Sequence, residues 1–232
     1  MNSRGDSSRG RGKLARYTRR MRFAVLALLS FALVACGGAP IVDVDNFKRP
    51  EPIPAGTSVD CTDLGPDKDL HGCDLSGQDL AEENLYNANL EGANLTGAKL
   101  KNADLRFANL KGANLTDADA HGANFGRAAM QSAILLRADI HGADLHGADL
   151  TNVDGRALFG SRAQLFQTIL DGADFTGAQL NGANFYQASM KGCILRNANM
   201  RNAYLAGADI NGADSSGAML QYAVMPDGSV QP

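Results

Sequence analysis

The sequence of 232 residues contains no tryptophan, and it has only four histidines and four cysteines. It contains no phosphate-binding loop, and no serine, histidine and aspartate can be assembled into a catalytic triad from the sequence. After residue 36 no hydrophobic run is long enough to span a membrane. That part holds 14 basic and 24 acidic residues, a formal charge of 14 − 24 = −10. These absences argue against an enzyme and against binding of nucleic acid through its phosphates.

The feature that the chain has in abundance is a five-residue repeat. From Leu70 to Met225, 28 of the 32 residues whose numbers are divisible by five are Leu, Ile, Phe or Met. Two residues before these positions, 26 of 32 are Ala or Cys. The apolar series has four exceptions, which are Ala120, Gly155, Gly160 and Ser215. A repeat this strict determines the fold class and indicates a solenoid.

A period of five fits neither a regular helix nor a flat strand. On an α-helix each five-residue step turns about 500°, so the leucines would scatter around the axis. On a strand an odd step would place them on alternate faces. The period therefore requires a corner in every repeat, with the large apolar residue and the preceding Ala both pointing inward. Gly or Asn two residues after the apolar residue suits such a corner, as at Gly92 and Asn87.

The repeats resemble the pentapeptide-repeat family, whose motif is A-(D/N)-L-x-x. Triplets at residues 93–95, 103–105, 113–115, 143–145 and 148–150 are among those that match this motif letter for letter. The resemblance implies an all-β fold, namely a right-handed, four-sided parallel β-helix of about eight coils. This β-helix is expected to cover residues 61–225, with residues 226–232 as a C-terminal tail.

Residues 1–35 are predicted to be a signal peptide. Arg19, Arg20 and Arg22 precede an apolar run that is too short for a comfortable membrane span. The segment 33–37, Leu-Val-Ala-Cys-Gly, resembles a bacterial lipobox. The resemblance implies cleavage before Cys36 and lipidation of that cysteine. An ordinary signal peptide with an incidental cysteine is the alternative.

Residues 36–60 are interpreted as the lipidated cysteine followed by a proline-rich linker. Pro40, Pro50, Pro52 and Pro54 suit an extended tether. The predicted location is extracytoplasmic, as a lipoprotein anchored in membrane lipid through Cys36. In a Gram-negative source, the glycines that follow the cysteine favour the outer membrane.

The other cysteines are assigned to the repeat region. Cys61 and Cys73 lie twelve residues apart in a chain that we expect to be exported, where a disulfide can form. Such a bond would contribute about 3 kcal/mol. A free buried thiol is the alternative, because Cys73 occupies an inward position. Cys193 also occupies an inward position and is interpreted as a packed small apolar residue.

The histidines are the only candidate metal ligands that the sequence suggests. His71, His121, His141 and His146 each follow an inward residue and should point outward. Because residues twenty apart should stack, His121 and His141 are expected to be neighbours, with His146 on the adjoining side. This group is a weak candidate for a transition metal. Solvated surface histidines are the simpler interpretation, so neither a metal site nor a cofactor is predicted.

The repeat is disturbed once, between residues 154 and 162. A projecting loop and two imperfect sides are both compatible with the pattern. Outward apolar residues near this break are a candidate surface for a protein partner: Ile134, Leu136, Phe159, Phe166 and Ile169. Four other outward aromatic residues are interpreted as scattered: Tyr86, Phe107, Tyr186 and Tyr204.

The C-terminal end of the solenoid leaves a second question open. The tail after Met225 is too short for a capping helix. The last coil is therefore either covered by that tail or paired with a second copy of the chain, because a solenoid end exposes core and backbone. Homodimerisation through this end is the corresponding hypothesis.

Three functions are compatible with these features. The favoured one is a non-enzymatic, lipid-anchored scaffold or protein-interaction rod. Resemblance to quinolone-resistance members of the family implies an alternative, an acidic DNA mimic that binds gyrase, although export does not fit a cytoplasmic target. Weak metal binding at the histidines is the third.

Overall fold

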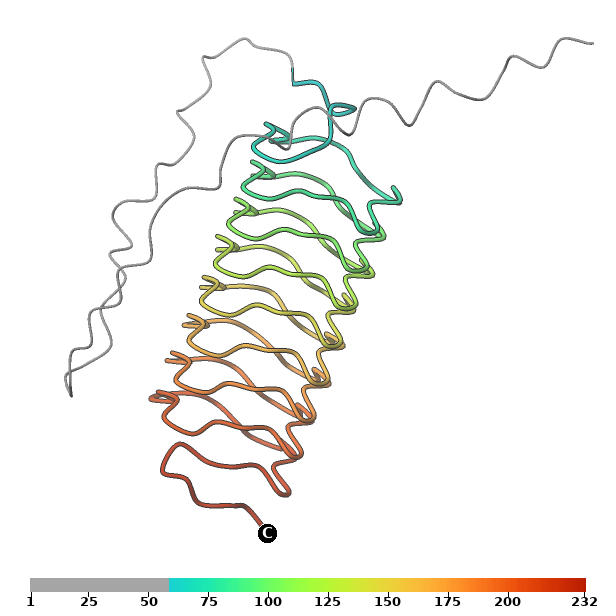
Figure 1. Ribbon diagram of the computed structural model, residues 1–232. Coiled ribbons are helices and arrows are strands. Elements are labelled where there is room, and N and C mark those ends of the chain that lie inside the picture. Colours follow the sequence, from blue (N-terminus) through green and yellow to red (C-terminus); the bar gives the residue numbers. More distant parts are fainter. Residues whose placement is uncertain (1–58) are drawn as a thin grey trace, which may run out of the picture. The chain divides into compact units, whose positions relative to one another are not determined.

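The computed structural model describes residues 59–232, which belong to the compact unit Arg49–Pro232. Within this range the chain forms neither a helix nor a continuous strand. It winds instead into stacked coils, from residue 59 at one end to the C-terminus at the other (Figure 1). The described part accordingly contains no helix that could cross a membrane.

Adjacent coils are joined by parallel bridges between residues twenty apart in sequence. The series begins at Asp69↔Asn89 and ends at Tyr204↔Val224. Four repeats therefore make one coil, and each repeat makes one side. We number the sides by their bridging residues, so that Asn84, Asn89, Asn94 and Lys99 lie on sides 1 to 4, and every twentieth residue follows on the same side.

Backbone hydrogen bonding explains why a five-residue unit is sufficient. The Leu90 N–H donates to Asn109 O at 2.7 Å, and the Gly92 N–H donates to Lys111 O at 2.9 Å, so both bonds run to the next coil. The Asn94 N–H donates to the previous coil at Cys73 O (2.8 Å). The Ala93 N–H closes the turn by donating to Leu90 O at 3.0 Å. Four of the five N–H groups in a repeat are thus satisfied by backbone.

In repeats with Asp or Asn before the inward residue, that side chain satisfies the fifth N–H group. The Thr116 N–H donates to Asn114 Oδ1 at 3.0 Å, and the His141 N–H donates to Asp139 Oδ1 at 2.9 Å. These are Asx turns, in which a short side chain caps the corner that follows it. The acceptor oxygen is what the Asp or Asn of the motif supplies to the fold.

The core is a column of inward residues that are fully buried. Leu105, Leu145 and the alanines two residues before them have no exposed surface. The segment 154–162 keeps this pattern, because its bridges Asp154↔Asp174 and Phe159↔Gln179 are in register. The disturbed segment is therefore two imperfect sides, and it does not project as a loop.

Larger residues fill the space that the two inward glycines leave. A Cβ built on Gly155 would lie 2.5 Å from Cδ1 of Phe175, so the Phe175 ring occupies that space from the next coil. At Gly160 the space is shared by Leu158, in the usual alanine position, and by Leu180. Leu158 and Gly160 thus exchange the usual places of the small and the large inward residue, which preserves the packing density of the core.

The corners hold the second residue after the inward one in the left-handed region. Gly92 has φ 64°, and Ala157 adopts φ 54° although it is not glycine. A non-glycine residue loses about 1–2 kcal/mol in this conformation. The chain therefore stores modest backbone strain at corners that lack glycine.

We expect Ala157→Gly to raise the free energy of unfolding by about 0.5 kcal/mol. Relief of the left-handed strain outweighs the greater entropy of glycine in the unfolded chain. Chemical denaturation measures the change. Ala163→Gly, at a buried inward position without positive φ, is the matched control and should lower stability. Equal changes for both variants would contradict this account.

The two ends of the coil stack are closed differently. At the N-terminal end Cys61 is bonded to Cys73, with 5.6 Å between the Cα atoms, and Val59 and Leu64 pack on the core. At the C-terminal end the tail folds back, with Val230 bridged antiparallel to Val224. The tail covers side 1 of the last coil.

Candidate interaction surfaces

The interior of the coil stack offers no room for a ligand, because side chains fill it. The inward Leu, Phe and Met residues from Leu70 to Met200 are almost entirely buried. Any partner of residues 59–232 must therefore meet the outer surface, where sides and edges present polar and aromatic residues in columns.

The five apolar residues grouped from the sequence do not form one surface. Ile134 lies on side 3 and Leu136 at the edge that follows it, whereas Phe159 lies on side 4. Ile169 lies on side 2, across the coil from Phe159, and Phe166 lies at the edge between sides 1 and 2. The grouping was wrong because closeness in sequence places residues on successive sides of a coil.

The histidines lie as the sequence predicts, with His121 and His141 as neighbours and His146 at the adjoining edge. His121 and His141 stack with ring centroids 5.1 Å apart. His146 lies at a different edge, where its Nδ1 contacts Asp144 Oδ1 at 2.9 Å and its ring stacks on Phe166 at 5.3 Å. Among residues 59–232 no group of three His, Cys, Asp or Glu side chains is arranged to hold a metal ion.

Outward aromatic residues gather along one edge, contrary to the sequence interpretation that they are scattered. The edge between sides 1 and 2 and its flanks carry the set that we call the aromatic edge: Tyr86, Phe107, His146, Phe166, Tyr186 and Tyr204. Three close ring pairs occur along it, with centroids 5.3–6.0 Å apart. The numbers 86, 146, 166 and 186 differ by multiples of twenty, so grouping residues by coil would have found this edge from the sequence.

The N-terminal half of the aromatic edge also carries arginine. The Arg106 guanidinium lies 5.6 Å from the centroid of the Tyr86 ring, and that of Arg127 lies 5.7 Å from the centroid of the Phe107 ring. Arg106 also donates to Asp104, and its hydrogen bonds hold the pKa of that carboxyl below its usual range. This half is therefore aromatic and charged.

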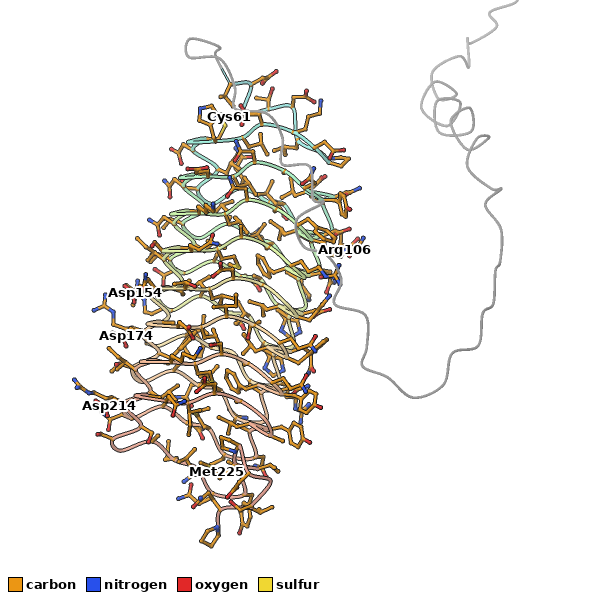
Figure 2. All side chains as sticks on the ribbon, turned by 90° about the vertical axis from the view of Figure 1, so that its left-hand side faces the viewer. Cys61, Arg106, Asp154, Asp174, Asp214 and Met225 are labelled. Carbon is orange, nitrogen blue, oxygen red and sulfur yellow. A yellow bond between two sulfur atoms is a disulfide. The ribbon has the colours of Figure 1, made fainter. Side chains whose placement is uncertain are left out.

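Side 3 presents a column of carboxylates. Asp154, Asp174 and Asp214 follow one another at intervals of twenty or forty residues, on the opposite side of the coil stack from Arg106 (Figure 2). Arg156 binds Asp154 through two hydrogen bonds, which lower the pKa of that carboxyl. Bonds from Ser216 and Arg196 lower the pKa of Asp214 to about 2. All three carboxylates are bonded to neighbouring side chains and backbone.

Cys193 is a free thiol inside the core, with no exposed surface. Burial raises its pKa to about 12, so the thiolate that reacts with alkylating reagents is absent at neutral pH.

We expect iodoacetamide to leave Cys193 unmodified in folded protein and to modify it in denaturant, as measured by peptide mass spectrometry. Rapid modification without denaturant would contradict the described packing.

Three sequence predictions lie wholly or mostly outside the described residues. The signal peptide, residues 1–35, and the lipidation site Cys36 precede residue 59, as does nearly all of the linker 36–60.

Comparison with protein families agrees with the coil geometry. The model for pentapeptide repeats matches the chain in eight copies, over residues 69–106, 98–135, 121–154, 161–197 and 198–227. The chain belongs to the pentapeptide-repeat family. A search of curated protein sequences found no match.

Solved structures place this pentapeptide-repeat protein among right-handed β-helices. HetL, a pentapeptide repeat protein involved in heterocyst differentiation regulation from the cyanobacterium Nostoc sp. strain PCC 7120, is 37% identical with a TM-score of 0.56. That match covers 71% of this chain and 75% of HetL. The plasmid-mediated fluoroquinolone resistance protein QnrB1 is 20% identical with a TM-score of 0.50, over 66% of this chain and 70% of that one. At that identity the likeness to QnrB1 concerns the fold alone.

Proposed function

We propose that this pentapeptide-repeat protein is a non-enzymatic interaction rod, of about eight coils, tethered by lipid at Cys36 outside the cytoplasm of a bacterium. The observation that supports the interaction role is the filled core. A stack whose interior consists of buried Leu, Phe, Met and Ala can contact a partner only through its sides, edges and ends.

The lipobox-like segment supports the tether. Basic residues, an apolar run and Leu33-Val34-Ala35-Cys36-Gly37 follow one another in the order expected of a lipoprotein signal. Several acyl chains on one cysteine would anchor the protein firmly, whereas a single chain would not. The segment between Cys36 and residue 59 would be the spacer between lipid and coils.

Fractionation of cells that express wild-type protein or Cys36→Ala tests this proposal. We expect the wild type in the membrane fraction and the variant released from it or retained as an uncleaved precursor. Cys193→Ala is the matched control, since it changes a cysteine without touching the lipobox. A wild-type protein that is soluble in the cytoplasm would overturn the tether.

The C-terminal coil is our proposed contact with a second copy of the chain. Ile210, Leu220 and Met225 point into the core but are only partly buried there. Their partial exposure leaves apolar surface at this end, although the tail covers side 1. Sedimentation should show a dimer that Leu220→Glu converts to a monomer. A wild-type protein that sediments as a monomer would exclude this contact.

The acidic surface favours one other candidate, a DNA mimic that binds gyrase. The formal charge of −10 after residue 36 is the supporting observation. Inhibition of gyrase supercoiling by stoichiometric protein would support this function in place of the anchored rod. No inhibition is the outcome that our main proposal expects.

A further inference from the structure

The C-terminal half of the aromatic edge differs from the rest of the surface because it is uncharged. Residues 163–167, 183–187 and 203–207 stack in successive coils along side 1 and its edge. These three pentapeptides contain no Asp, Glu, Lys or Arg, although the chain after residue 36 carries a formal charge of −10. We call this surface the neutral strip.

Aromatic rings run along the neutral strip. Tyr186 and Tyr204 stack with centroids 6.0 Å apart and an interplanar angle of 26°. They are 40% and 43% exposed, so both remain open to a partner. Phe166, one coil earlier at the same edge, is half-buried. Rings of this kind provide apolar faces and edges, and tyrosine adds a polar hydroxyl.

Primary amides flank the rings on both sides. On side 1 the Asn184 Nδ2 group donates to Gln164 Oε1 at 3.1 Å. Across the edge, the Gln167 Nε2 group donates to Gln187 Oε1, also at 3.1 Å. Asn184 Oδ1 also accepts from the Tyr186 N–H, and Gln164 Nε2 also donates to Arg162 O, both at 3.1 Å. Because an amide has two donor hydrogens and two acceptor lone pairs, each of these groups keeps one of each for a ligand. The flanks can therefore bind groups that both donate and accept hydrogen bonds.

We propose that the neutral strip binds a neutral, extended glycan chain. The C–H faces of pyranose rings pack on aromatic side chains, and their paired hydroxyls match the donors and acceptors of amides. Adjacent coils lie about 4.8 Å apart. One sugar of an extended β-linked chain advances by a similar distance, so successive sugars would meet successive coils.

Charge and backbone pairing argue against other polymers on this strip. A nucleic acid or an acidic polysaccharide would need Lys or Arg, which the strip lacks. A peptide added as a β-strand would need free backbone groups. Along the strip those groups bond to neighbouring coils, as in the bond from the Phe185 N–H to Tyr204 O at 2.7 Å.

The inference goes beyond the proposed scaffold role and does not depend on the lipid anchor. The test uses purified full-length protein and two probes, cellohexaose and chitohexaose. Because the chain has no tryptophan, its intrinsic fluorescence comes from five tyrosines, of which Tyr186 and Tyr204 lie in the strip. We expect saturable binding of at least one probe with a Kd of about 1 mM, as suits an open surface.

Variants locate the site. Tyr186→Ala should weaken binding by about fivefold, and Gln187→Ala by a smaller factor. Phe159→Ala and Tyr222→Ala are matched controls, since both remove aromatic rings that are exposed outside the strip. Titration calorimetry measures all four variants, and circular dichroism checks that each remains folded.

Three outcomes would overturn the inference. The first is no saturable binding of either probe at ten times the expected Kd. The second is an equal loss of binding in the Phe159→Ala or Tyr222→Ala control. The third is occupation of the strip by a proline-rich peptide while both glycans fail to bind, which would assign the surface to a protein partner. None of these outcomes would alter the result of the Cys36→Ala fractionation.

Discussion

Gly155→Leu is expected to lower the free energy of unfolding by about 3 kcal/mol. Leucine is the residue that the repeat itself would place there, so a design that follows the pattern would choose it. In the structure a side chain at this position would meet the Phe175 ring, beginning at the Cβ. Phe175 is itself buried among inward residues, so it cannot move aside without further strain. Urea denaturation measures the change.

A second substitution tests whether contact with Phe175 causes the destabilisation by Gly155→Leu. Gly155→Leu combined with Phe175→Leu removes the larger ring, and we expect it to recover most of the lost stability. Ser215→Leu is the matched control, since Ser215 is also an exception to the apolar series but is exposed in the last coil. Its effect should lie within about 0.5 kcal/mol of zero. Equal destabilisation by Gly155→Leu in both backgrounds would contradict the described packing.

Removal of the disulfide by Cys61→Ala and Cys73→Ala is expected to cost about 3 kcal/mol at the N-terminal end. The bond closes a short loop over the first coil, and Cys73 is 2% exposed. Alanine is the usual inward residue two positions before the apolar one, so the double variant preserves core packing. In a solenoid, each coil is stabilised by its neighbours. The loss of stability should therefore be greatest in the coils nearest the N-terminal end.

Hydrogen exchange distinguishes this local effect from global unfolding. Amides of the first coils, such as Leu75 and Leu80, should lose protection, whereas Leu145 in the middle should keep it. Addition of dithiothreitol to the wild-type protein should reproduce the result. Unchanged exchange at Leu75 after reduction would show that the disulfide does not stabilise this end.

The sequence predicted the features of this fold that depend on one repeat. Leu145 and Ala143 were assigned inward positions because a five-residue corner repeat allows no other arrangement, and both are buried. Features that depend on the coil were harder to predict. Phe175 fills the Gly155 space from the next coil, and Tyr186 pairs with Tyr204 in the next coil. The repeat places such residues near each other, but it does not specify the size and direction of the side chains that make these contacts.

The surface features also divide into those that one repeat predicts and those that depend on the coil. Ile134, Phe159 and Ile169 are close in sequence, yet each points from a different side of the coils. The role of the Asp and Asn side chains in capping the next N–H was also missed, because the motif fixes the residue without stating its hydrogen bond. The fold-back of the tail onto Val224 depends on a hairpin that has no repeat pattern.

The proposed function depends most directly on the chemical state of Cys36. Intact-mass spectrometry of protein extracted from bacterial membranes with detergent measures that state. We predict a chain that begins at Cys36 and carries the added mass of several acyl chains. A chain that retains residues 1–35 without modification, recovered from the soluble fraction, would contradict the account.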